Sequence, residues 1–163
     1  MNTDMKIEIL KLLENDARLT SAQIAVMLAL EEPAVRNAID ELEKEGVIVG
    51  YHTVVDWEKT DRESVSAMID VKLTPQTGRG FDRVAEKIYN YPEVQAVYLM
   101  SGTYDLSVLI QGKTMKEVAF FVSQKLAPID AVISTATHFV LHKYKATGVL
   151  YDAQNTDERE NCN

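Results

Sequence analysis

Apolar side chains recur along the first 46 residues at the three- and four-residue spacing of α-helices. This spacing predicts a first helix ending near Asn15, a short second helix capped by Thr20 or Ser21, and a third helix beginning near Pro33. Gly46 ends the third helix, because glycine commonly follows the last helical turn. The N-terminal part of the chain is therefore expected to be helical throughout.

The third helix has a predicted buried stripe made of Val35, Ile39 and Leu42, and it is followed by the apolar run 47–51, which reads as a short strand. Three small helices and a strand are typical of a winged helix-turn-helix. Residues 1–50 are therefore predicted to form such a domain, and residues 51–63 a linking strand or hinge.

From Ser64 onward the apolar residues alternate with polar ones at the period of a strand, and two helical segments interrupt this alternation. The predicted elements are strand 65–73, helix 81–90, strand 94–100, strand 105–111, helix 115–125 and strand 132–142. This βαββαβ order is that of a ferredoxin-like domain, expected over residues 64–151. The predicted fold class is thus α+β, with residues 152–163 as a polar, disordered tail.

The inward positions of the two helices of this domain follow the same periodicity. They are predicted to be Phe81, Val84, Ala85 and Ile88 in the first, and Met115, Val118, Ala119, Val122 and Leu126 in the second.

The strand 94–100 is apolar on both faces, with Tyr98 and Met100 on one and Val97 and Leu99 on the other. Helices cover only one face of such a sheet, so the second apolar face needs a partner, most simply another copy of the sheet. We therefore expect at least a homodimer. The alternative is that some of these side chains are singly exposed.

Composition fits a globular chain: of 163 residues, 46% are hydrophobic and 26% charged. No apolar run approaches the length of a membrane span, so no membrane association is expected. Cys162 is the single cysteine, which excludes a disulfide framework and suits a reducing cytoplasm.

The net charge of −8 is unevenly distributed. Residues 1–60 contain six basic and twelve acidic side chains, a net charge of −6, while residues 61–163 carry −2. This balance argues against a protein that coats nucleic acid indiscriminately, although it permits a focused basic patch.

Three stretches resemble the Lrp/AsnC (feast/famine) family of bacterial and archaeal transcription regulators. LTSAQIAVMLALEEPAVRNAIDELEKEGVIVGY is similar to the family's helix-turn-helix, SGTYDLSV to its G-x-YDL hairpin, and STATHFVLHKYK to its last strand. The resemblance implies a cytoplasmic regulator that binds double-stranded, pseudo-palindromic DNA. It also implies homodimers that assemble further, commonly to octamers, and an amino-acid effector.

The third helix would lie in the major groove, where residues near its N-terminal half read base edges. Arg36 could bond guanine, Asn37 could bond adenine, and an alanine could touch a thymine methyl group. The candidate DNA-binding residues are Ser21, Ala34, Arg36, Asn37, Ala38 and Lys44.

The third helix departs from its relatives, which carry several basic residues where this chain has Ala38, Asp40 and Glu41. DNA binding is therefore expected to be weak and salt-sensitive, and to need several helix-turn-helix units at once. The alternative function is an amino-acid-sensing oligomer that has lost operator binding and acts through protein contacts. In the preceding turn, Ala29 stands where glycine is common, and it is strained there if that position needs a positive φ.

The hairpin 101–105 is the best candidate for the effector site. An amino acid needs donors for its carboxylate and an acceptor for its ammonium; a glycine turn exposes backbone, and Asp105 can accept. These groups could equally serve an ordinary tight turn. The candidate effector-binding residues are Ser101, Gly102, Tyr104, Asp105, Thr135 and Thr137.

Other chemistry is not expected. His138 and His142 lie four residues apart on a strand, about 13 Å along it, which is too far for one metal ion. The sequence has no phosphate loop, nucleophile elbow or zinc-type spacing. We therefore expect no metal, no cofactor and no enzymatic activity.

Overall fold

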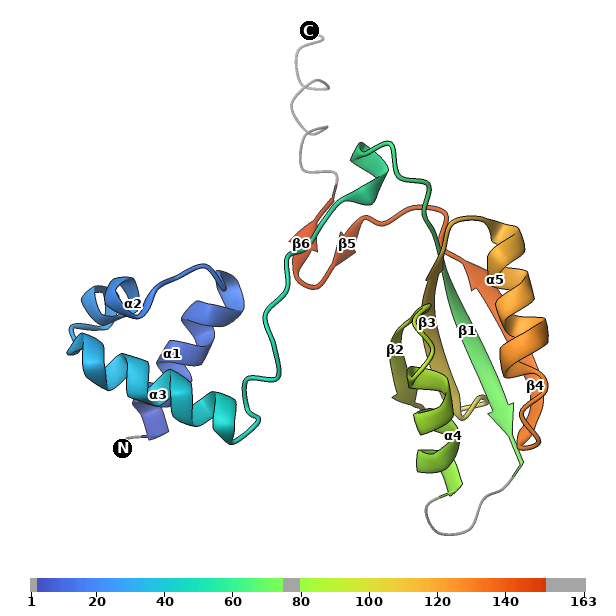
Figure 1. The fold of residues 1–163 in the computed structure, drawn as a ribbon, viewed down its shortest axis with the longest axis horizontal. Coiled ribbons are helices and arrows are strands. Elements are labelled where there is room, and N and C mark those ends of the chain that lie inside the picture. Colours follow the sequence, from blue (N-terminus) through green and yellow to red (C-terminus); the bar gives the residue numbers. More distant parts are fainter. Residues whose placement is uncertain (1–2, 75–79, 152–163) are drawn as a thin grey trace, which may run out of the picture. The chain divides into compact units, whose positions relative to one another are not determined.

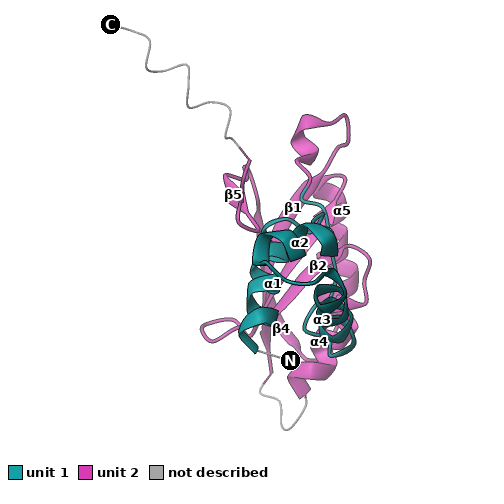
Figure 2. Cartoon of the chain, turned by 90° about the vertical axis from the view of Figure 1, so that its left-hand side faces the viewer, with its two compact units in different colours: residues 1–54 teal, residues 55–163 magenta. Residues whose placement is uncertain are grey.

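The computed structural model describes residues 3–74 and 80–151, and its chain divides into two compact units, residues 1–54 and 55–163. Figure 2 colours the two units separately. The predicted tail 152–163, with Cys162, lies outside the described residues.

The N-terminal unit is a three-helix domain whose elements are α1 (Thr3–Asn15), α2 (Ser21–Leu28) and α3 (Glu32–Lys44). Thr20 caps α2 as predicted: its side chain accepts from the Gln23 backbone, and the Gln23 side chain accepts from the Thr20 N–H. Pro33 lies in the first turn of α3, where its missing N–H costs nothing. The three helices enclose one apolar core, which contains Ile9, Leu13, Ile24, Ala25, Val35 and Ala38.

The turn between α2 and α3 places Ala29 in the left-handed region, with φ 53° and ψ 46°. This backbone lets the Leu30 N–H donate to the Ala25 carbonyl at 2.9 Å, which closes the end of α2. A residue with a Cβ is strained in this conformation, so the turn retains the shape that glycine would favour although the chain has alanine there.

Ala29→Gly is therefore expected to stabilise the N-terminal unit by about 1 kcal/mol, because glycine adopts the left-handed conformation without strain. Urea denaturation monitored by circular dichroism measures this change. The control is Ala22→Gly at an exposed position inside α2, which is expected to destabilise the unit. Equal destabilisation by both substitutions would contradict the assigned turn.

The segment after α3 differs from its prediction. Gly46, at φ +70°, ends the helix as expected, and the Val47 and Ile48 N–H groups both donate to the Leu42 carbonyl. The predicted strand 47–51 is not formed in the described chain: a strand needs a neighbouring strand to complete its hydrogen bonds, and these residues instead wrap the end of α3. Tyr51 donates a hydrogen bond to Glu43 of that helix at 2.9 Å.

The C-terminal unit contains the predicted βαββαβ succession (Figure 1). Its elements are β1 (Val65–Leu73), α4 (Gly80–Tyr89), β2 (Val94–Leu99), β3 (Leu106–Gly112), α5 (Met115–Phe121) and β4 (Val132–Phe139). The strands form one antiparallel sheet in the order β2-β3-β1-β4. The last strand ends earlier than predicted, and a small hairpin of β5 (Lys145–Ala146) and β6 (Val149–Leu150) was not predicted.

Both helices lie on the same face of this sheet (Figure 1), and the core of the unit fills the space between the helices and the sheet. Ile69 and Val71 of β1 are paired in register with Val108 and Leu106 of β3, and all four are buried. The helix α4 buries Val84 and Ile88 against them, as predicted.

The second helix buries partly different residues from those predicted. Met115 and Ala119 are exposed, whereas Phe121, which was not predicted, is buried. The helix is followed by a π-helical turn, η2 (Val122–Leu126), in which the Ala127 N–H donates to the Val122 carbonyl at 2.8 Å. A π turn inserts one residue, so Leu126 reaches the core where a regular helix would place Lys125.

The helix-free face of the sheet leaves large side chains accessible. Met68, Tyr98 and Met100 are each about half exposed (47%, 57% and 48%). His138 Nε2 lies 3.4 Å from Asp70 Oδ2 on the neighbouring strand of the same face. The expected second apolar face thus exists, but it includes charged side chains at the β1–β4 edge.

Candidate functional site

The helix α3 presents two of the predicted DNA-reading side chains to solvent. Arg36 and Asn37 are exposed in its N-terminal half, and Lys44 is exposed in its last turn. Ala34 is half-buried. Ala38 was predicted wrongly: it is fully buried in the core and cannot touch a base.

The error has a physical cause. The buried stripe of α3 consists of Val35, Ala38 and Leu42, whereas Ile39 is only partly buried. Positions 38 and 39 are adjacent on the helix, so both lie near its core-facing side; in the folded unit Ala38 lies at the centre of the core and Ile39 packs against its margin.

Glu32 brings together two of the predicted DNA-binding residues. Its Oε1 atom accepts a hydrogen bond from the Arg36 guanidinium one turn later, and it accepts another from Ser21 Oγ at 3.3 Å across the α2–α3 turn. Sequence analysis did not assign Glu32 this role, although its four-residue spacing from Arg36 is a recognised ion-pair signal. The main basic DNA-binding candidate of α3 is therefore partly neutralised within the folded chain.

A second basic group near α3, Lys6, is also paired with acidic side chains. Lys6 of α1 lies 3.1 Å from Glu41 and 3.5 Å from Glu45. The hydrogen bond that Lys6 donates to Glu41 raises the pKa of Lys6 above its ordinary value, so the ammonium stays charged and paired. Glu41 thus supports the packing of α1 against α3, and the helix has fewer uncommitted positive charges than its sequence suggests.

In the C-terminal unit, the hairpin 101–105 joins β2 to β3. Ser101 and Gly102 are exposed, and Tyr104 and Asp105 are half-buried. Asp105 is committed to the sheet: its Oδ2 atom accepts from the Leu73 N–H at 2.8 Å, and Lys72 Nζ lies 3.4 Å from the same oxygen. The backbone hydrogen bond from Leu73, assisted by Lys72, lowers the pKa of Asp105 below its ordinary value.

Thr135 and Thr137 do not join Asp105 in one pocket of a single chain. They pair in register with Val71 and Ile69, whose side chains point into the helix-covered core. Paired residues of neighbouring strands share a face, so the two threonines lie on the helix-covered face of the sheet. Lys72, the partner of Asp105, follows Val71 in the strand and therefore lies on the opposite face.

Lys72 is a polar neighbour of the hairpin that sequence analysis missed. The available signal was the alternation in β1, where Asp70 and Lys72 occupy successive positions of the helix-free face. Asp105 and Lys72 together offer one acceptor and one donor of opposite charge beside an exposed glycine turn.

The depressed pKa of Asp105 makes folding stability depend on pH. Its ionised form is favoured in the folded chain, so this stabilisation is present above the unfolded pKa and is lost as pH falls through the lower folded pKa. The unfolding free energy of the wild type should therefore fall between pH 6 and pH 3, and that of the Asp105→Asn variant should fall less. Parallel denaturation curves of the two proteins at each pH measure this difference, and identical slopes would contradict it. Asp61→Asn, at an exposed acid, is the control.

The described residues give little support for a metal site or a membrane-spanning helix. His138 pairs with Asp70, and His142 Nδ1 lies 3.7 Å from Glu58, so the two histidines have separate partners. Among residues 3–74 and 80–151, no three His, Cys, Asp or Glu side chains gather as a metal site would require. None of the helices in that part of the chain combines the length and hydrophobicity of a membrane span.

Comparison with protein families gives two matches that together cover most of the chain. A winged helix-turn-helix DNA-binding domain matches residues 3–49, and the Lrp/AsnC ligand binding domain matches residues 66–150. An uncharacterized HTH-type transcriptional regulator of Bacillus subtilis, YugG, is 50% identical over 158 residues, covering 96% of this chain and 95% of its own. The HTH-type transcriptional regulator LrpA of Pyrococcus abyssi is 31% identical over 137 residues, covering 84% and 94%.

Solved structures share the fold at lower identity. AsnC of E. coli superposes with a TM-score of 0.70 at 18% identity, covering 90% of this chain and 96% of its own. The L-Met complex of a Neisseria meningitidis transcriptional regulator gives a TM-score of 0.74 at 22% identity, covering 93% and 98%. These similarities support the α+β fold with an N-terminal winged helix-turn-helix.

Proposed function

The chain belongs to the Lrp/AsnC family of DNA-binding transcriptional regulators, and we propose that it reads DNA through α3 within a homo-oligomer whose C-terminal units bind an amino acid. Family membership makes it a regulator and not an enzyme. It also favours the DNA-binding interpretation over an oligomer that acts only through protein contacts. We place its action in the cytoplasm.

The observation that carries the DNA-reading proposal is the exposure of Arg36 and Asn37 together on the N-terminal half of α3. Arg36 has the geometry for a bidentate bond to guanine and Asn37 for one to adenine. Lys44 and Ser21 would contact phosphates, and Ala34 is near enough to the surface for a methyl contact. A dimer would place two α3 helices on half-sites about one DNA turn, ~34 Å, apart.

Recovery of DNA from the organism's own genome tests this proposal. The purified protein is mixed with genomic fragments at about 50 mM salt, where electrostatic binding is strongest, and bound fragments are sequenced with and without pooled amino acids. We expect a set of fragments sharing a pseudo-palindromic sequence. Recovery of fragments without a shared sequence would argue against base reading by α3.

The oligomer proposal rests on the helix-free face of the sheet, where Met68, Tyr98 and Met100 remain about half exposed. A second copy of the sheet would remove these side chains from water. We propose assembly beyond the dimer, to an octamer, because members of the Lrp/AsnC family commonly form octamers. Several helix-turn-helix units in one assembly would compensate by multivalency for the acidic charge around each α3.

The effector proposal rests on the pair Lys72–Asp105 beside the Gly102 turn. Lys72 would hold the carboxylate of an amino acid, and Asp105 Oδ1 would accept from its ammonium, because Oδ2 is occupied by the Leu73 N–H. Ser101 and Tyr104 would add hydroxyls, whereas Thr135 and Thr137 can contribute only from a second chain. The L-Met complex of the Neisseria relative makes amino acids the first ligands to screen.

A calorimetric titration of the common amino acids into the full chain tests the effector proposal. Asp105→Asn keeps the shape of the side chain and removes its charge, so it should weaken binding about ten- to a hundredfold. If no amino acid binds the wild type more tightly than about 1 mM, the hairpin is an ordinary turn.

A further inference from the structure

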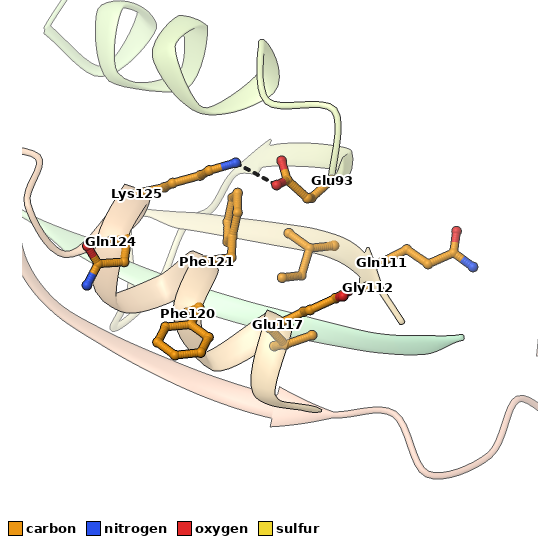
Figure 3. Close-up of a pocket in the computed structure, with 10 residues that line it drawn as sticks. Glu93, Gln111, Gly112, Glu117, Phe120, Phe121, Gln124 and Lys125 are labelled. Atoms are coloured by element: carbon orange, nitrogen blue, oxygen red, sulfur yellow. Dashed lines mark hydrogen bonds and ion pairs between the residues drawn. The ribbon is translucent and has the colours of Figure 1, made fainter. Parts of the chain in front are cut away.

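A pocket of about 340 Å³ lies along α5 and the end of β3 (Figure 3). Residues 101–105 of the hairpin are not among its lining residues. Its apolar wall includes Val118, Phe120 and Phe121, and Ile110 of β3 also lines it. Its size falls within the range of small-molecule sites, which combine apolar walls with a few polar groups.

One end of the pocket is formed by an ion pair between two distant segments. Lys125 Nζ lies 2.5 Å from Glu93 Oε1, and Figure 3 shows the two side chains pointing toward one another. The hydrogen bond from Lys125 lowers the pKa of Glu93, so the carboxylate is charged. Its second oxygen, Oε2, is buried and has no hydrogen-bond partner among the described residues. A buried acceptor without a partner favours any ligand that can donate to that carboxylate after a small rearrangement.

The π turn places polar side chains at this pocket. By inserting one residue it turns Leu126 into the core and leaves Gln124 and Lys125 on the pocket lining (Figure 3). The π turn follows the C-terminal end of α5, and π turns are rare and frequently found at functional sites. This feature is independent of the ion pair, and it points to the same pocket.

The charges and rings of the pocket favour a cationic ligand. Two carboxylates, Glu93 and Glu117, line it against the single cation Lys125. Lys125 Nζ lies 5.0 Å from the centre of the Tyr91 ring and 5.5 Å from that of Phe121, so the aromatic faces at this end already attract positive charge.

We propose that this pocket binds a small organic molecule with an apolar body that ends in an ammonium group. The apolar body would lie against Phe120, Phe121 and Val118, and the ammonium would donate to the Glu93 carboxylate and share it with Lys125. Two sources supply this chemistry: simple alkylamines, and amino acids with an apolar side chain. The site is separate from the Lys72–Asp105 pair and does not depend on the effector proposal.

A ligand series on the wild-type full chain tests the proposal. Isoamylamine, isoamyl alcohol, isocaproic acid and L-leucine have similar branched apolar bodies and differ in their polar ends. Calorimetric titration should show the amine binding at least about tenfold more tightly than the alcohol and the acid. Measured in the Asp105→Asn variant, which lacks the acceptor charge of the hairpin, L-leucine binding as tightly as the amine identifies amino acids as the source, and weaker binding identifies alkylamines. Equal binding of alcohol and amine, or no saturable heat from the amine, would overturn the proposal.

Substitutions of the two partners of the ion pair are expected to have opposite effects on amine binding. Glu93→Gln removes the acceptor charge and should weaken amine binding about ten- to a hundredfold. Lys125→Gln removes the competing cation and should strengthen it several-fold. A structural role of the pair alone would make both variants weaker, which would contradict the proposal.

Two further variants separate this pocket from other sites. Glu86→Gln makes the same charge change on the exposed face of α4 and is expected to leave amine binding unchanged. Asp105→Asn distinguishes the pocket from the hairpin: amine binding that survives this substitution belongs to the pocket, and amine binding that disappears with it would overturn the assignment.

Discussion

Arg36→Ala is expected to weaken DNA binding by about 1–3 kcal/mol for each half-site, and Glu32→Gln is expected to strengthen it. The two effects have one cause. Glu32 accepts hydrogen bonds from Arg36 and Ser21, so in the wild type it competes with the DNA for both groups. Replacing this carboxylate by an amide also removes a negative charge from a surface that approaches phosphates.

Fluorescence anisotropy with a recovered DNA fragment, measured over a range of salt concentrations, checks both expectations. Glu32→Gln should steepen the salt dependence, because more positive charge becomes available to the phosphates. The matched control is Glu14→Gln on α1, which removes the same charge at an exposed position outside α3. If Arg36→Ala and Glu32→Gln both leave binding at the wild-type level, α3 does not read the DNA.

The double variant Met68→Asp/Tyr98→Asp is expected to dissociate the proposed oligomer without unfolding the chain. Both side chains are about half exposed on the helix-free face of the sheet (47% and 57%), so the charged replacements remain solvated in the monomer but are buried in a sheet-to-sheet contact. Val97 is unsuitable for this purpose, because it packs against the core of the unit.

Equilibrium sedimentation at micromolar concentration measures the outcome, and far-UV circular dichroism reports folding. Met115→Asp/Tyr89→Asp is the matched control: it changes the same residue types, with similar exposure of 55% and 56%, on α5 and α4. A control that dissociates as readily, or a test variant that stays assembled, would place the interface elsewhere.

The sequence by itself determined the three N-terminal helices and the βαββαβ succession of the C-terminal unit, because the signals for these elements are local. Thr20 and Gln23 mark the start of α2 by reciprocal hydrogen bonds, and Gly46 marks the end of α3 through its left-handed backbone. Pro33 marks the start of α3 because its φ is fixed and its missing N–H is not needed in the first turn. The alternation of apolar residues in β1 likewise specified its buried face. The family resemblance, carried by short local motifs, was confirmed by the matches over both units.

Only the tertiary structure decided which side chains meet. Periodicity could not tell whether position 38 or 39 of α3 faces the core, because both flank the buried stripe, and packing placed Ala38 inside. The commitment of Asp105 to Leu73, and its separation from Thr135 and Thr137, depend on how strands far apart in sequence are paired. The pair Glu93–Lys125 spans 32 residues and depends on a π turn that no local pattern announced. Such contacts follow from strand register and helix winding in the folded chain, which is why the candidate site residues were harder to predict than the fold.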